Sequence, residues 1–297
     1  MTDLLRKLSR LSVEKGHDAY ADVAWDAPEM RLDADDPVWE LGDEEPLGGT
    51  AWYRAQPPAH RARIGLHIVA CKMKIGLQFE NILMRGLLEF ALAQPDGVVP
   101  ARRYAYHEVI EEAQHTLMFQ EFIDRARLPV GGLGPVVGFL GRRVAALGQS
   151  FPELFFVFVL GGEGPIDHVQ RAALGADAPL HPLLRRIMEI HVSEEARHLA
   201  FARHYLMDHV PRLGGLRKAR LRLGAPFILG ALSRLMLRPA PEVVHTHQIP
   251  SAVVSEAYDK NPAHRVATQE ALRGVLDLCR ELDLVRPTLW RLAGLAV

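Results

Sequence analysis

The chain has 297 residues, of which 48% are hydrophobic and 24% are charged. These proportions match soluble globular proteins and exclude disordered, collagen-like and supercharged chains. The 35 Lys and Arg residues nearly balance the 36 Asp and Glu residues, so the chain lacks the net positive charge that favours nucleic acid binding. Two cysteines are too few for a disulfide framework or a thiolate zinc site, whereas the 14 histidines direct attention to imidazole ligands.

The sequence predicts a cytoplasmic protein without a membrane partner. Charged residues interrupt the leucines of residues 1–12, so this segment lacks the apolar region of a signal peptide. The most apolar stretches, residues 154–162 and 225–232, are much shorter than the roughly 20 residues that cross a bilayer. We therefore expect neither a membrane nor a nucleic acid as a partner.

The predicted regular elements are all helices, because no stretch has the alternating pattern of a β-sheet. Residues 18–60 are rich in Asp, Glu, Pro and Gly and are interpreted as an irregular arm. Apolar spacing, prolines and turn residues predict helices over residues 61–93, 100–126, 135–147, 152–172, 183–208, 216–237, 262–282 and 285–296. We expect a single domain over 1–297, with a non-regular N-terminal arm (1–60), a helical core (61–210) and extra C-terminal helices (211–297).

Two predicted helices carry the same short motif. Residues 110–115 read Ile-Glu-Glu-Ala-Gln-His, and residues 193–198 read Ser-Glu-Glu-Ala-Arg-His. In Glu-x-x-His the two side chains are neighbours on one helix face and can reach one ion. A single copy is more often a solvated pair, but two copies predict Glu112, His115, Glu195 and His198 as metal ligands.

Bundles that bind two iron or manganese ions add one glutamate from each of two further helices. In the helix over 61–93, Glu80 lies among apolar residues, where an unpaired carboxylate would be costly. In the helix over 152–172, Glu163 follows an apolar run and needs a partner as strong as a metal. The glycines that flank Glu163 predict a bulge in this helix, with room for oxygen or substrate.

Four carboxylates and two divalent ions would form a neutral site. An oxygen-rich ligand set without thiolates favours iron or manganese over zinc and copper, and the spacing does not choose between these two metals. His191 shares a helix face with Glu195 and His198, so spacing alone makes it either a third histidine ligand or a core histidine. Glu111 and Glu194 could accept hydrogen bonds from the ligating imidazoles, although Glu111 could equally belong to a solvated face.

These motifs resemble the p-aminobenzoate N-oxygenases of the AurF type, a family of ferritin-like non-haem di-iron enzymes. The resemblance covers about residues 22–205 and rests on Trp25-Asp26-Ala27-Pro28-Glu29, Asp36-Pro37-Val38-Trp39-Glu40-Leu41, Gly76-Leu77-Gln78-Phe79-Glu80-Asn81, residues 112–121, Gly162-Glu163 and residues 191–198. It includes the histidine four residues before the last Glu-x-x-His. Position by position, the iron ligands that the resemblance implies are Glu80, Glu112, His115, Glu163, His191, Glu195 and His198.

The resemblance also implies an all-α, ferritin-like helical bundle that forms a homodimer and holds two iron ions. Members of the family use O2 as co-substrate and convert an aromatic amine to the hydroxylamine and onward to the nitro compound. Such an enzyme needs an external electron donor, and manganese would fit the same ligands. No substrate residue is assigned, and Arg197 is expected to pair with a neighbouring glutamate.

Fold and metal cluster do not fix the substrate. The main alternative is therefore a di-iron oxidase or hydroxylase of the same fold that acts on a lipid or an aliphatic amine. A ferritin-like iron-binding protein is less favoured, because the long arm does not suit a cage-forming chain. His245 and His247 alternate in a predicted loop without a neighbouring carboxylate or thiolate, and we do not expect them to bind a second metal.

Overall fold

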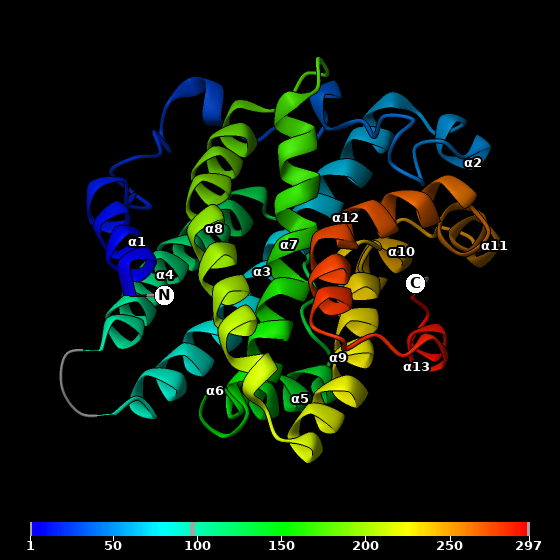
Figure 1. Cartoon of the computed structure of the whole chain (residues 1–297). Helices are drawn as coiled ribbons and strands as arrows, with labels where there is room; N and C mark the ends of the chain where they lie inside the picture. The colour runs from blue at the N-terminus through cyan, green and yellow to red at the C-terminus, as the bar shows by residue number, and fades with distance from the viewer. Residues whose placement is uncertain (1, 96–98, 296–297) are drawn as a thin grey trace.

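The computed structural model describes residues 2–95 and 99–295, with the backbone alone for residues 135 and 136. All regular structure in these residues is helical, and no strand occurs in them. The predicted all-α bundle with C-terminal helices packed on it is confirmed (Figure 1). Of the helix predicted over 285–296, only Pro287–Leu292 is helical in the described residues, and residue 296 lies outside them.

Four long helices form the centre of the bundle, and each begins at a proline. They are α3 (Pro58–Leu92), α4 (Pro100–Ala126), α7 (Pro152–Gly175) and α8 (Pro182–His209). Proline suits the first turn of a helix because its φ is already helical and its missing N–H would have no partner there. α3 packs along α4, and α7 packs along α8, so the centre consists of two helix pairs.

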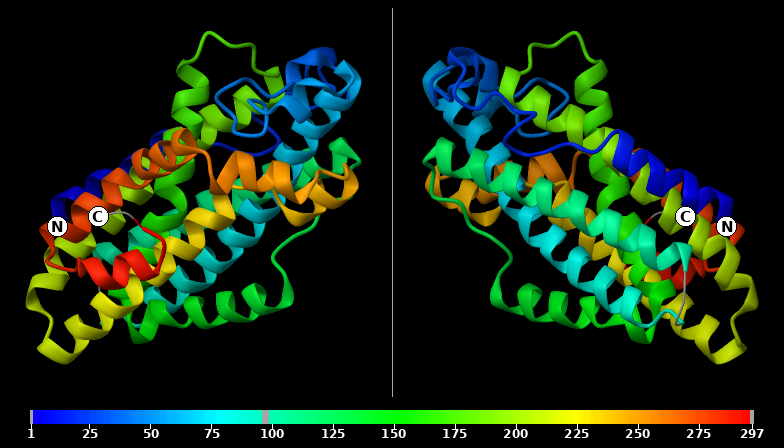
Figure 2. Two further views of the ribbon diagram at one scale, coloured as in Figure 1. Left: turned by 90° about the vertical axis from the view of Figure 1, so that its right-hand side faces the viewer. Right: turned by 90° about the vertical axis from the view of Figure 1, so that its left-hand side faces the viewer.

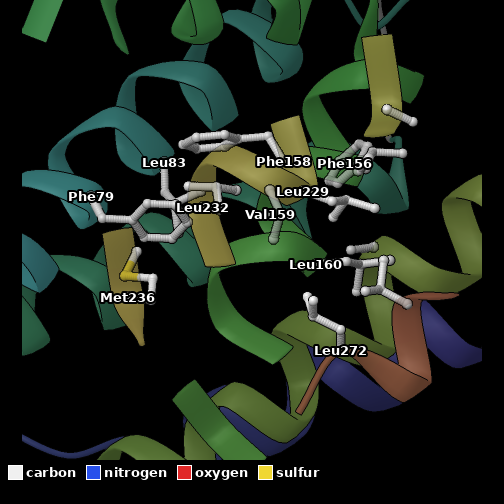
Figure 3. Packing of buried hydrophobic residues seen from close by; sticks show 14 of the residues in the cluster. Phe79, Leu83, Phe156, Phe158, Val159, Leu160, Leu229, Leu232, Met236 and Leu272 are labelled. Atoms are coloured by element: carbon white, nitrogen blue, oxygen red, sulfur yellow. The ribbon is translucent and has the colours of Figure 1, made fainter. Parts of the chain in front are cut away.

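The C-terminal helices cover the second pair. α9 (Gly215–Met236) and α12 (Pro262–Glu281) both pack on α7, and α13 (Pro287–Leu292) packs on α9. α10 (Pro241–Thr246) lies against α3, and α11 (Ser251–Val254) leads through a π turn, Ser255–Asp259, toward α12. Figure 3 shows the apolar contact between α3, α7, α9 and α12, formed by Phe79, Leu83, Phe156, Phe158, Val159, Leu160, Leu229, Leu232, Met236 and Leu272.

The N-terminal arm is less irregular than predicted. It begins with α1 (Thr2–Glu14), which buries Leu5 and Leu8 and packs on α4 and α8 (Figure 2). The leucines lie on one side of an otherwise polar helix, and this amphipathic spacing explains why the segment folds against the bundle. The arm continues through 3-10 turns at Pro28–Met30 and Pro37–Trp39 to the single turn α2 (Ala51–Arg54).

Two shorter helices lie across one end of the bundle. In both views of Figure 2 an extended segment leads from α4 to α5 (Pro135–Ala145), and α6 (Leu147–Ser150) follows. Both helices contact α3. None of the helices in the described part of the chain combines the length and hydropathy of a bilayer-spanning segment.

The predicted bulge beside Glu163 is wrong, because α7 continues as an α-helix through residues 161–165. Two of the glycines serve close packing instead. A Cβ atom on Gly161 would lie 2.5 Å from Leu229 Cδ2, and one on Gly162 would overlap the ring of Phe79. The absence of these side chains lets α7 approach α3 and α9, which offsets the low helix propensity of the glycines.

Candidate metal centre

The seven residues predicted as metal ligands meet between the four long helices. Glu80 comes from α3 and Glu163 from α7, and the two motif helices α4 and α8 supply the rest. None of the seven is more than 2% exposed: they are Glu80, Glu112, His115, Glu163, His191, Glu195 and His198. Seven buried acid and imidazole groups in one place need compensating partners.

The seven side chains form overlapping groups whose ligand atoms lie within 4.8 Å of one another. These groups are Glu80 with His115 and His191, Glu112 with His115 and Glu195, Glu163 with His191 and Glu195, and Glu80 with Glu112 and Glu163, and His198 joins Glu112 in a fifth group described below. Atoms that each lie about 2 Å from one ion are at most about 4 Å apart. The spacing is therefore close to what a bound ion requires.

Glu112 and Glu195 occupy the middle of the cluster. His115 Nδ1 is 3.0 Å from Glu112 Oε2 and 3.6 Å from Glu195 Oε1. His198 Nδ1 is 3.1 Å from Glu112 Oε1 and 3.2 Å from Glu195 Oε1. Two histidines from different helices thus present the same nitrogen to the same two carboxylates, an arrangement that could bridge two ions.

A second pair of glutamates holds the opposite nitrogens of these histidines. His115 Nε2 lies 2.8 Å from Glu194 Oε2, and His198 Nε2 lies 2.7 Å from Glu111 Oε2. A carboxylate only accepts hydrogen bonds, so each glutamate places a proton on Nε2 and turns Nδ1 toward the cluster. The predicted hydrogen bonds of Glu111 and Glu194 are confirmed, and each glutamate holds the histidine of the other helix.

Two cationic or donor groups in turn hold the outer glutamates. Arg197 Nη2 donates to Glu111 Oε1 at 2.6 Å, which confirms the predicted pairing with a glutamate. Burial raises the pKa of Glu111, but the neighbouring His198 and Arg197 outweigh it and lower the pKa to about 2. From the N-terminal arm, His17 places its backbone N and its Nδ1 3.0 and 3.1 Å from Glu194 Oε1. No sequence motif marks His17.

Several atoms of the cluster have no hydrogen-bond partner among the described residues. They are Glu80 Oε2, Glu112 Oε1, Glu163 Oε1, Glu195 Oε2 and His191 Nδ1; the 3.1 Å contact of His198 Nδ1 with Glu112 Oε1 lacks the geometry of a hydrogen bond. Burial and the neighbouring carboxylates raise the pKa values of Glu80 and Glu163 well above their usual range. A cation would supply both the missing partners and the missing positive charge, and oxygen and imidazole donors without thiolates fit iron or manganese.

The histidines respond to the same charges in opposite ways. Burial lowers the pKa of His115, but hydrogen bonds to Glu112 and Glu194 outweigh this effect and raise the pKa to about 10. Burial lowers the pKa of His191 to about 4, which leaves its imidazole neutral and able to bind a metal. A metal that binds His115 Nδ1 must therefore displace a proton.

The cluster contains one carboxylate that the sequence analysis missed. Glu108 on α4 is 0% exposed, and its ligand atoms form a further group with those of Glu112 and His198. Neither oxygen has a hydrogen-bond partner among the described residues, and burial raises the pKa of Glu108 to about 8. The available signal was its place four residues before Glu112, which repeats the place of His191 before Glu195.

Comparison with known proteins gives the family. The model of the family described as p-aminobenzoate N-oxygenase AurF matches residues 1–283, so the chain belongs to this family of di-iron oxygenases. Uncharacterized proteins of Mycobacterium tuberculosis and Mycobacterium bovis are each 35% identical over 293 residues, which cover 98% of this chain and 86% of the relative. The names of these relatives give no activity. The class is therefore a di-iron oxygenase, and the residues above could hold its metals.

Proposed function

We propose that the chain is a non-haem di-iron monooxygenase that N-oxygenates an arylamine to the hydroxylamine or nitro compound. The proposed iron ligands are Glu80, Glu112, His115, Glu163, His191, Glu195 and His198. The observation that carries the proposal is this set of seven buried groups, five of whose atoms lack a hydrogen-bond partner among the described residues. Family membership supports the oxygenase class, and the arylamine is the finer step that we add.

The iron pair, when bound, supplies the electrons that reduce O2, and an external donor restores them. The side chains of the protein hold and orient this pair. Glu112 and Glu195, which both face His115 and His198, would hold the iron pair from the middle of the cluster, and the outer glutamates direct the two histidines toward it. The buried rings of Phe79 and Phe158, whose centroids lie 4.8 Å apart, would exclude water from the side of Glu80.

We propose a cavity of about 550 Å³ between α7, α8 and α12 as the route of the amine. Gly164 and Leu199 line this cavity, and each directly follows a proposed ligand in the sequence. The cavity combines leucines, which suit an aromatic ring, with Arg203 and Arg273, which pair with Glu281 and Glu270.

The proposal is tested by loading the metal-free protein with ferrous iron without oxygen and then mixing it with O2. The optical spectrum and the products are followed with carboxylated arylamines, neutral arylamines, aliphatic amines and fatty acids in parallel. We expect oxygenation at nitrogen for an arylamine and none with the His198→Ala variant. Oxygenation of only an aliphatic amine or a lipid would contradict the substrate and favour the alternative oxidase, and iron uptake into large assemblies, seen by light scattering, would favour storage.

A further inference from the structure

The two helix pairs repeat one pattern of residues. Glu163 precedes Glu195 by the same number of residues as Glu80 precedes Glu112. On α8, His191 lies four residues before the glutamate of Glu-x-x-His and seven before its histidine. Glu108 lies at the same two intervals on α4. Since both helices have the same geometry, Glu108 occupies the position that corresponds to His191.

The contacts in the cluster follow this repeat. On one side, His115 of α4 meets His191 of α8, together with Glu80. On the other side, His198 of α8 meets Glu108 of α4, together with the central Glu112. Each motif histidine therefore lies near one residue of the opposite helix. That residue precedes the glutamate of the opposite Glu-x-x-His by four positions.

Glu108 also lacks any other partner that would explain its burial. Its side chain is 0% exposed, and neither oxygen has a hydrogen-bond partner among the described residues. An ionised carboxylate in such a place is costly unless a cation or several donors compensate it. The only other explanation that the contacts leave is a neutral, protonated acid that fills space.

We propose that Glu108 is an additional metal ligand, to the ion that His198 binds, and that it is the counterpart of His191 on the other ion. The inference rests on the proposed function, because it presupposes a centre of two ions. The two ions then differ in charge environment, since one has an imidazole where the other has a carboxylate. The extra negative charge favours the oxidised form of its ion and lowers the reduction potential of the pair.

The first test is metal binding by Glu108→Gln, Glu108→His and the matched control Tyr104→Phe. Tyr104 lies one turn before Glu108, and its buried hydroxyl also lacks a partner, so the control removes a polar atom without removing a ligand. Each metal-free protein is loaded with ferrous iron without oxygen, and iron per chain and affinity are measured against a competing chelator. Circular dichroism of the metal-free variants reports folding.

We expect two irons per chain in the original protein and in Tyr104→Phe. Glu108→Gln should weaken one of the two sites by at least about tenfold, since even residues that only support ligands cost 10–100-fold. Glu108→His should restore binding at two sites, because it gives α4 the ligand pattern of α8. Two sites of unchanged affinity in Glu108→Gln would overturn the inference, because glutamine mimics the neutral acid. An original protein that binds no iron would instead contradict the proposed function.

The second test separates the charge of Glu108 from its role as a ligand. Glu108→His keeps a ligand but removes the negative charge, so its midpoint potential, measured by redox titration of the iron-loaded protein, should be higher than that of Tyr104→Phe. An unchanged potential in a Glu108→His protein that holds two irons would contradict coordination of an ion by Glu108. Neither test depends on turnover of a substrate.

Discussion

The molecule contains two clusters of three histidines, and their surroundings differ sharply. In the first, the candidate metal centre, carboxylates surround His115, His191 and His198, and several atoms have no hydrogen-bond partner among the described residues. The second, which we call the histidine chain, joins residues 60, 247 and 67 between α3 and α10. No carboxylate belongs to this chain of contacts in the described residues.

Every ring nitrogen of the histidine chain lies within 3.2 Å of a polar atom. His60 lies 3.2 Å from Gln56 Oε1 and 3.1 Å from His247 Nδ1. The other nitrogen of His247 lies 3.1 Å from His67 Nδ1, and His67 Nε2 lies 2.8 Å from the carbonyl oxygen of Pro129. Through these contacts the histidine chain connects α10 and the segment after α4 to α3.

The comparison indicates that buried atoms without partners, and not histidines as such, mark a candidate metal centre. It also corrects one detail of the sequence analysis. His245 lies within the helix α10 and His247 caps its C-terminal end, so neither lies in an open loop as predicted. The expectation that these two histidines bind no second metal stays a prediction.

The largest contrast should come from removing one residue of each cluster. Glu112→Ala deletes a central carboxylate that faces both motif histidines. We therefore expect the affinity for both irons to fall by more than about 100-fold, which exceeds the loss caused by removing a residue that only supports a ligand. Oxygenase turnover should fall with it. His67→Asn should retain two irons per chain. Iron analysis after dialysis measures both, and iron loss in His67→Asn would remove the distinction between the clusters.

Metal addition should stabilise the protein through the first cluster alone. A ligand at 100 times its dissociation constant stabilises the folded state by about 2.7 kcal/mol per site. We expect ferrous iron or Mn²⁺ to raise the unfolding free energy of the original protein and of His67→Asn equally, and that of Glu112→Ala little. Urea unfolding without oxygen, with and without metal, gives these differences. Equal stabilisation of Glu112→Ala would place the binding site elsewhere.

The outer glutamates should have a smaller effect. Glu194→Gln keeps the size of the side chain but removes the charge that fixes His115, and Glu111→Gln does the same for His198. We expect each variant to lose about 10–100-fold in iron affinity. The matched control is Glu153→Gln, which removes a buried carboxylate paired with Arg217 outside the centre. A control that loses as much affinity would indicate a general loss of stability.

Much of the fold could be predicted because its signals are local. Apolar spacing and initial prolines identified the four central helices to within a few residues, as at α7, which was expected to begin at Pro152 and does so. The prediction of a bulge beside Glu163 was wrong because close packing against Phe79 and Leu229 offsets the low helix propensity of Gly161 and Gly162. That compensation depends on side chains from α3 and α9, which local propensity does not include.

The centre was predictable where a motif repeats and unpredictable where a single residue acts across the fold. The two copies of Glu-x-x-His led to the motif helices, and burial among apolar residues led to Glu80 and Glu163. Glu108 was not predicted because it lies outside the Glu-x-x-His motif and differs in residue type from His191, its counterpart on the other helix. His17 reaches Glu194 from a distant part of the chain through folding of the arm, and no spacing rule in the sequence reports such a contact.

The smallest expected effect is a pH dependence of the histidine chain. Burial, followed by the neighbouring His67 and His60, lowers the pKa of His247 from 6.5 to about 4. Between these pH values the unfolded chain binds more protons than the folded one, so this stabilising contribution is present above pH 6.5 and is lost as the pH falls toward 4. His247→Asn removes the titrating group and should lack this dependence.

The difference in unfolding free energy between the original protein and His247→Asn isolates this contribution, because groups of the metal centre titrate equally in both and cancel. One titrating proton can change this difference in unfolding free energy by at most about 1.4 kcal/mol per pH unit. We expect a smaller change, because His247 is only half-buried. Denaturant unfolding at several pH values measures it. A difference that grows as the pH falls would mean that protonation strengthens the histidine chain, which would then act as a charged cluster like the metal centre and not as a neutral contact.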